Sequence, residues 1–260
     1  MTDTFYRNLS RPRSAASSVK SVRSSRSVRS TSPTSSVGNN RDENDALRPY
    51  VDAISQMFVR TREKGYNFSA VSDCIEEEIT LKKLEPTQIF SWLSSNQNTV
   101  QYTTLLGFFY FQGIGIPVEQ RKGFSLFLTA AKMDFFVAQD LVADCYGFGL
   151  GTTKNEDLSF MWYQKASQNG SVDGQFGLGY CYEAGIGTVK SMSKAFQLYK
   201  KSSKKENRSA MFMLAQCYEQ GTGTSKDLEQ AIYWYRKAKE CGNSDAEAPL
   251  AELLATKNSG

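Results

Sequence analysis

The chain of 260 residues has no histidine, only six prolines and an odd number of cysteines, five. Without histidine it cannot build Ser-His-Asp or Cys-His nucleophilic systems, and it lacks the commonest metal ligand. An odd cysteine count, in a chain where we recognise no signal peptide, favours a reducing compartment over a disulfide framework. We therefore expect a non-enzymatic cytoplasmic protein that has no cofactor and no bound metal.

An internal repeat is the clearest feature that the sequence does contain. The Gly-Ile-Gly turn at 113–115 recurs as Gly-x-Gly at 149–151, 185–187 and 221–223, with a step of 36 residues. A fixed period of this size is typical of solenoids and arrays. The turns lack the third glycine and the preceding strand of a dinucleotide-binding fingerprint, so they indicate helix ends and not a nucleotide site.

Helical spacing surrounds each turn. Before it, an aliphatic residue, a small residue and a tyrosine follow one another at i, i+1 and i+4, as at 178, 179 and 182. After it, apolar residues such as those at 160, 163 and 166 have the pattern of an amphipathic helix. Cysteines at equivalent places in three first helices are interpreted as small buried residues: Cys145, Cys181 and Cys217. The sequence therefore predicts an all-α fold, a right-handed α-solenoid of helix-turn-helix units.

The domain boundaries follow from where this period starts and stops. Four repeats are expected at 99–134, 135–170, 171–206 and 207–242, and a C-terminal capping helix at 243–260. Residues 46–98 do not follow the period and are interpreted as a helical N-terminal cap, with an independent interaction module as the alternative. Its helices are expected to begin near Ala46, with Pro49 in the first turn, then at Phe68 and at Pro86.

Residues 1–45 form a basic tail rich in serine and arginine, which we expect to be disordered because it offers little apolar surface to bury. Residues 1–40 hold seven Lys/Arg against a single acid, Asp3. Arginine three residues upstream gives Ser10, Ser14 and Ser32 a plausible kinase context, and phosphates would reverse the charge of the tail. We favour a regulatory tail. A mitochondrial presequence, a tether to nucleic acid or anionic lipid, and a plain linker are the alternatives.

The units resemble the Sel-one-like repeat, a relative of the tetratricopeptide repeat. A Leu-Gly-x-x-Tyr-x-x-Gly-x-Gly core matches at 178–187, and an Ala-x-x-Trp-Tyr-x-Lys-Ala second helix matches at 231–238. Segments 86–90, 96–98 and 105–110 look most similar to fungal members. The resemblance implies a scaffold or adaptor for protein partners in signalling, cell-wall synthesis or quality control. The alternative is a regulatory subunit that activates a partner enzyme of the signalling-kinase or chitin-synthase type. We expect neither a nucleic-acid partner nor a stable membrane anchor.

In tetratricopeptide relatives the first helix of each unit lines a concave face. Carried onto this sequence, the resemblance points to ten partner-binding residues: Phe108, Phe111, Asp140, Asp144, Phe148, Phe176, Tyr180, Glu183, Phe212 and Glu219. Aromatic side chains interleaved with carboxylates suit an extended or helical peptide that carries Lys/Arg and an apolar anchor. The competing interpretation is that some of these aromatics are core residues at the repeat seams. A further hypothesis is that residues 10–30 occupy this groove until phosphorylation expels them.

Overall fold

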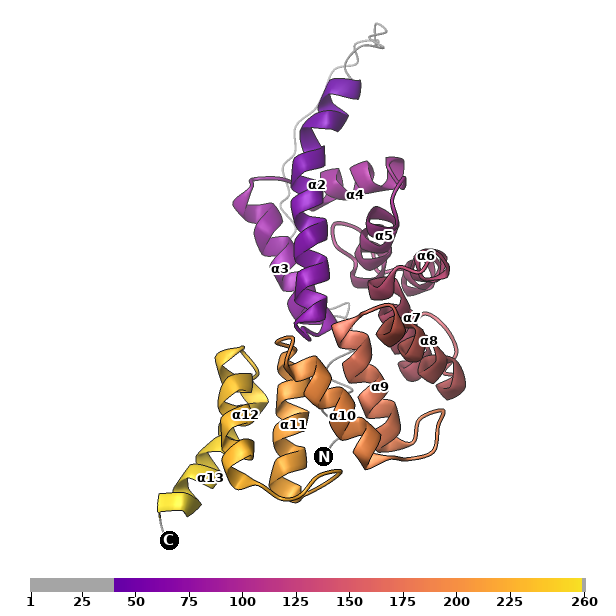
Figure 1. Cartoon of the computed structure of the whole chain (residues 1–260). Helices are drawn as coiled ribbons and strands as arrows, with labels where there is room; N and C mark the ends of the chain where they lie inside the picture. The colour runs from indigo at the N-terminus through magenta and orange to yellow at the C-terminus, as the bar shows by residue number, and fades with distance from the viewer. Residues whose placement is uncertain (1–39, 259–260) are drawn as a thin grey trace, which may run out of the picture.

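The computed structural model describes residues 40–258, which form helices and no β-strand (Figure 1). The N-terminal helices are α2 (Asn40–Glu63), α3 (Phe68–Leu81) and α4 (Pro86–Ser95). The repeats follow as four hairpins: α5 (Val100–Gln112) with α6 (Gln120–Lys132), α7 (Phe136–Phe148) with α8 (Glu156–Gln168), α9 (Val172–Ala184) with α10 (Met192–Ser203), and α11 (Arg208–Gln220) with α12 (Leu228–Glu240). A 3-10 helix, Ser244–Ala246, and α13 (Glu247–Asn258) follow.

Local sequence explains where the paired helices begin and end. Side-chain oxygens accept hydrogen bonds from backbone N–H groups in the first turn of several helices, which satisfies donors that have no partner inside the helix: Thr99, Asn155, Ser171, Asn207 and Asp227. Each of the four first helices ends at the first glycine of its turn, in the left-handed region with φ between 70° and 79°. The helix-turn-helix unit predicted from the sequence is therefore confirmed.

The second glycine of each turn lies where consecutive repeats meet. Gly187 has φ 59°, and a Cβ atom there would overlap the carbonyl oxygen of Glu156 at the start of α8. Glycine is thus required both by the backbone conformation and by the space. At the same seam Phe160 of α8 meets Tyr182 of α9 edge to face, with ring centroids 5.6 Å apart. The repeating tyrosine therefore joins each repeat to the one before it.

Helix α4 takes the place of a second helix in front of the first repeat. Phe90 of α4 meets Tyr110 of α5 edge to face, with centroids 5.2 Å apart, as Phe160 meets Tyr182 one seam later. A Cβ atom at Gly115 would overlap Pro86, the first residue of α4. Helix α4 therefore covers the N-terminal end of the array and makes the same contacts there that the second helix of a repeat makes with the next repeat.

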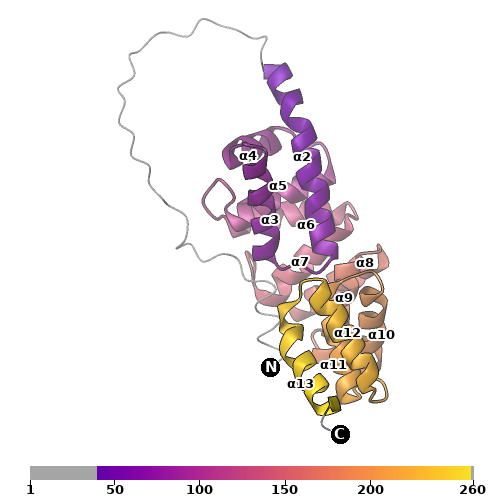
Figure 2. The same ribbon diagram turned by 90° about the vertical axis from the view of Figure 1, so that its left-hand side faces the viewer.

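Helices α2 and α3 lie elsewhere, against the side of the first helices (Figures 1 and 2). Helix α2 contacts α5, α7 and α9, and α3 contacts α5. The structure corrects two expectations about α2: the helix begins at Asn40 and not near Ala46, and Pro49 lies inside it and not in its first turn. Residues 1–39, with the phosphorylation candidates Ser10, Ser14 and Ser32, lie outside the described residues.

At the C-terminal end, the 3-10 helix and α13 pack against α12. Ala246 and Leu250 are buried there in one apolar cluster with Tyr235 and Ala238 of α12. The last element of the described chain thus covers the apolar side of the fourth repeat, as a terminal element of a solenoid must.

Candidate functional site: the inner face of the repeat array

We call the side of the four first helices on which α2 and α3 lie the inner face, and divide it into an N-terminal half (α5 and α7) and a C-terminal half (α9 and α11). The ten residues predicted to bind a partner all belong to these four helices. The structure brings them onto one array, but it also lays two helices of the same chain across the N-terminal half. The two halves therefore present different surfaces.

Arg62, in the last turn of α2, is inserted among three aspartates of the array. Its Nη2 atom lies 3.3 Å from Asp140 Oδ1, 3.0 Å from Asp144 Oδ2 and 2.7 Å from Asp173 Oδ2. The side chain of Arg62 is 4% exposed. Asp140 and Asp144 belong to α7, and Asp173 lies in the first turn of α9. One guanidinium group thus ties α2 to two consecutive repeats.

The next residues of α2 and its connection to α3 bind the starts of α9 and α11. The Glu63 carboxylate accepts hydrogen bonds from the Val172 N–H, at 3.0 Å, and from the Ser171 hydroxyl, at 3.1 Å. A carboxylate at a helix N-terminus satisfies free N–H groups and is favoured by the helix dipole. The Arg208 N–H donates to the Lys64 carbonyl oxygen at 3.1 Å, at the start of α11. The end of α2 is therefore bound in the manner of a ligand.

Three carboxyl groups surround this single guanidinium, Glu63 lies next to it in the sequence, and burial shifts the pKa values of all four acids. Burial raises the pKa of Asp144 to about 6, although Arg62 acts in the opposite direction. Burial likewise raises the pKa of Asp140, of Asp173 and of Glu63. Burial lowers the pKa of Arg62, but the three aspartates outweigh it, so that this pKa lies above its ordinary value. The cluster carries more negative than positive charge whenever its acids are ionised.

The aromatic residues of the N-terminal half are covered. Phe108 and Phe111 are fully buried. Phe58 of α2 lies 4.9 Å from Phe108, and Phe68 of α3 lies 5.3 Å from Phe111, between ring centroids. The expectation that Phe108 and Phe111 face a partner is corrected here, because α2 and α3 already occupy that surface. Arg62 stacks over Phe68 with 5.0 Å between its guanidinium carbon and the ring centroid.

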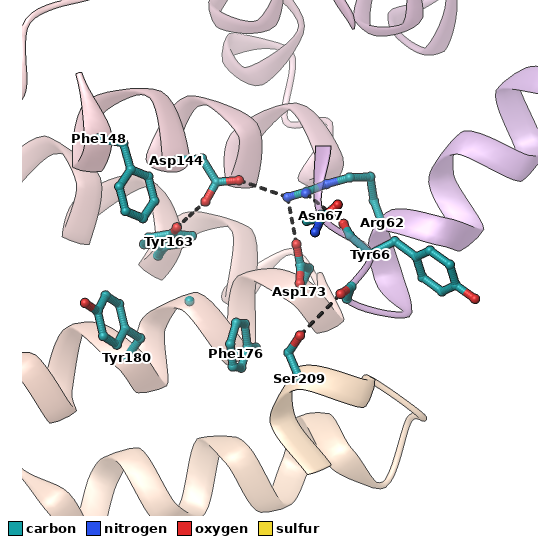
Figure 3. A pocket seen from close by; sticks show the side chains of 12 residues that line it. Arg62, Tyr66, Asn67, Asp144, Phe148, Tyr163, Asp173, Phe176, Tyr180 and Ser209 are labelled. Carbon is teal, nitrogen blue, oxygen red and sulfur yellow. Dashed lines mark hydrogen bonds and ion pairs between the residues drawn. The ribbon is translucent and has the colours of Figure 1, made fainter. Parts of the chain in front are cut away.

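A pocket lies where the covered surface meets the C-terminal half. The aromatic rings of Phe148, Tyr163, Phe176 and Tyr180 surround much of it, and Arg62, Asp144 and Asp173 form one side (Figure 3). Tyr66, Asn67 and Ser209 complete the rim towards α3 and α11, with Gly65 and Gly177 also in the wall. Four of the predicted residues therefore meet in one cavity: Asp144, Phe148, Phe176 and Tyr180.

The remaining predicted residues of the C-terminal half are paired with second helices. Glu183 and Glu219 are half-buried and accept hydrogen bonds from the phenols of Tyr199, at 2.5 Å, and Tyr235, at 2.6 Å. Phe212 is buried against Tyr235, with ring centroids 5.6 Å apart. These contacts agree with the competing interpretation that some predicted aromatics are seam residues.

Sequence reasoning missed Arg62, Glu63 and Asp173, and a signal for them did exist. Helices α7 and α9 contain acidic residues but no lysine or arginine. Buried carboxylates need a cationic or hydrogen-bonding partner, so that partner had to come from outside the period. Arg62 lies in α2 beside buried apolar residues such as Phe58. A helix whose surface is exposed to solvent would have carried polar residues at those positions instead.

The five cysteines are unbonded, and Cys145, Cys181 and Cys217 are buried, as predicted. Burial raises the pKa of Cys181 to about 12 and of Cys217 to about 11, which keeps both thiols protonated and unreactive.

Within residues 40–258 no group of His, Cys, Asp and Glu side chains is arranged to hold a metal ion. The helices of this same range include none with the length and apolar character needed to cross a bilayer.

Comparisons with known proteins agree with this geometry. A Sel1 repeat protein from Oxalobacter formigenes has a solved structure with a TM-score of 0.64 and 24% identity, over 83% of this chain and 88% of that one. The protective antigen c5321 of uropathogenic Escherichia coli, which displays an SLR fold, has a TM-score of 0.60 and 24% identity, over 85% of this chain and 45% of that one. No curated protein matches the sequence.

These solved structures come from bacteria, so the expected similarity to fungal members is not supported. The predicted right-handed α-solenoid is confirmed by them and by the family model. The model of the Sel1 repeat matches residues 103–135, 137–171, 172–207 and 208–243, which together make up more than half of the chain. This chain belongs to the Sel1 repeat family.

Proposed function

We propose that the protein is a non-enzymatic adaptor that binds a peptide of a partner protein in the pocket and along the C-terminal half of the inner face. Sel1 repeat proteins are generally scaffolds for protein interactions. The observation that carries the proposal is the pocket itself, with four aromatic rings and two aspartates around one cavity. Concave sites with apolar walls and a few convergent polar groups are where binding is expected in a protein without a known ligand.

The array's own binding of α2 indicates the chemistry of the partner. There a helix end is held by an arginine among carboxylates and by apolar contacts such as Phe58 with Phe108. The pocket adjoins this contact: two of the carboxylates that bind Arg62, Asp144 and Asp173, form one side of it, and aromatic rings form the others. A partner segment with Lys/Arg next to an apolar anchor therefore fits it best.

Two finer points belong to the same proposal. Phosphorylation of Ser10, Ser14 or Ser32 would regulate partner binding, because each phosphate adds close to two negative charges to a basic segment. The protein would act in the cytoplasm, which suits five unbonded cysteines. The alternative, a subunit that activates a partner enzyme, differs in one measurable way: the partner's rate and not only its location would change on binding.

The test is capture of partners by the full chain and by two matched variants, followed by a direct binding measurement on each captured protein. Phe148→Ala removes a half-buried ring from the pocket, and Tyr233→Ala removes a 48% exposed ring from the second helix α12. We expect Phe148→Ala to weaken binding at least tenfold and Tyr233→Ala to leave it unchanged. If both variants bind the same partner with wild-type affinity, the pocket is not the binding site.

A further inference from the structure

We propose that the basic segment 10–30 of the same chain binds in this pocket, with one of its arginine side chains among the four aromatic rings and beside Asp144 and Asp173. The inference rests on the proposed function, since the segment would hold the site that a partner peptide has to enter. The group that the site recognises is then a guanidinium, and the chain itself supplies it.

The rings make the pocket suitable for a cation. A guanidinium group near an aromatic face is attracted by the quadrupole of the ring, and more strongly where water is excluded. The protein already uses this contact twice at the rim of the pocket: Arg62 lies over Phe68 at 5.0 Å, and Arg208 lies over Tyr66 at 3.9 Å. Phe148, Phe176 and Tyr180 face the cavity from the opposite side (Figure 3).

The charges around the pocket favour a second cation. Asp144 and Asp173 line the pocket beside Arg62, and Asp140 pairs with the same guanidinium, so three carboxyl groups share one cation there. Segment 10–30 has the opposite balance, with six Lys/Arg and no acid: Arg11, Arg13, Lys20, Arg23, Arg26 and Arg29. Opposite charge of this kind steers encounter and fixes which partner is chosen.

The length of chain between the segment and the pocket permits the contact. The pocket is at the C-terminal end of α2, and Asn40 is at the other end. At a rise of about 1.5 Å per residue, the helix from Asn40 to Arg62 is roughly 33 Å long. An extended chain covers at most about 3.3–3.6 Å per residue, so the ten residues that follow segment 10–30 reach about as far. Arg29 is therefore at the limit of reach, and the cations N-terminal to it are within reach.

The experiment uses a synthetic peptide of residues 10–30 with a fluorescent label. The receptor is the full chain in which the seven Lys/Arg of residues 1–40 are changed to glutamine, so that its own tail does not compete. We expect saturable one-to-one binding that weakens with added salt, because exposed charges are screened. The same peptide should bind the wild-type chain at least threefold more weakly, because the wild-type tail already occupies the site.

Matched variants tie the binding to the pocket and to the guanidinium groups. Phe148→Lys places a like charge at the half-buried position of the pocket and should reduce affinity at least tenfold, whereas Tyr233→Lys on α12 should not change it. A peptide with citrulline in place of each arginine keeps the shape without the charge and should bind at least tenfold more weakly. Phe148→Leu, which keeps an apolar side chain, and the melting temperature of each variant control for folding.

Absence of saturable binding, or binding that Phe148→Lys leaves unchanged, overturns the inference. Its failure can be told apart from failure of the adaptor function. If captured partners need Phe148 while the peptide does not bind, the pocket serves partners only and the tail is not its occupant. If the peptide needs Phe148 while partners do not, the tail binds the pocket and the partner site lies elsewhere.

Discussion

The two halves of the inner face use the same repeat positions for different chemistry. Position 140 is aspartate in the N-terminal half, and one and two periods later it is Phe176 and Phe212; position 144 is likewise aspartate, then Tyr180. The aspartates lie where Arg62 enters, and the aromatic residues lie beyond it. The array is thus specialised for its own N-terminal helices at one place and retains an aromatic pocket at the next. The difference shows that the N-terminal helices of a repeat array can also occupy part of its binding face.

The strongest way to break this comparison is to remove the guanidinium that holds α2 in the N-terminal half. Arg62→Ala leaves three buried aspartates without their cation, and breaking a buried ion pair in this way costs about 3–5 kcal/mol. We expect a loss of this size in the free energy of unfolding, measured by urea denaturation. Hydrogen exchange should also show faster exchange at the Val172 amide, which Glu63 protects.

Lys64→Ala is the control for Arg62, because it lies two residues further on with its side chain 49% exposed and a single 3.8 Å contact to Glu206. Exposed ion pairs contribute little, so its change should stay below about 0.5 kcal/mol. Equal losses from the two variants would mean that Arg62 does not hold α2 to the array.

Truncating one phenylalanine beneath α2 and one at the pocket should separate structure from binding. Phe108→Ala empties a fully buried site beneath Phe58 and should cost about 3–5 kcal/mol. Phe148→Ala, at the half-buried edge of the pocket, should cost much less stability but most of the partner affinity. Urea denaturation and a binding titration on both variants test the contrast. A stability loss at Phe148 as large as that at Phe108 would place Phe148 in the core and not at a binding surface.

The same phenol–carboxylate hydrogen bond occurs in both halves and can sharpen the comparison. Tyr163 donates to Asp144, which is buried, and Tyr199 donates to Glu183, which is half-buried. Tyr163→Phe leaves a buried acceptor unsatisfied and should cost about 1–3 kcal/mol, whereas Tyr199→Phe should cost less because water can hydrogen-bond the half-buried carboxylate of Glu183. The first repeat already has phenylalanine at this position, Phe127, so the ring itself is accommodated. Thermal or urea denaturation of both variants should rank Tyr163→Phe as the more damaging, and the reverse order would contradict it.

The sequence predicts the repeats well because each is built from local signals: a capping residue, an apolar stripe and a glycine such as Gly185 in the left-handed region. The sequence also predicts four residues of the pocket, because the 36-residue period fixes which positions of each first helix lie on the inner face. The placement of α2 is not local. Arg62 and Asp144 are 82 positions apart and belong to elements without a shared period, so only the unmatched charge of α7 and α9 points to their contact.

The pH dependence of the free energy of unfolding should give the smallest of these effects. Its sign is unusual for a carboxyl group, because stability falls as pH rises. The pKa of Asp144 is raised from its ordinary value, 3.8, to about 6 by burial, so the folded protein binds a proton there at a pH at which the unfolded chain does not. Stability from this group is therefore present at low pH and lost as pH rises through about 6. Between pH 7 and pH 5 we expect the free energy of unfolding of the wild type to rise by about 1 kcal/mol more than that of Asp144→Asn, measured by urea denaturation at both pH values. Asp140, Asp173 and Glu63 have raised pKa values as well and remain in both proteins; loss of the Asp144 charge lowers the pKa of Asp140 in the variant, which adds to the expected difference. If the wild type instead lost stability relative to Asp144→Asn on acidification, the pairing with Arg62 would outweigh burial, and the N-terminal half would be held by an ordinary ion pair.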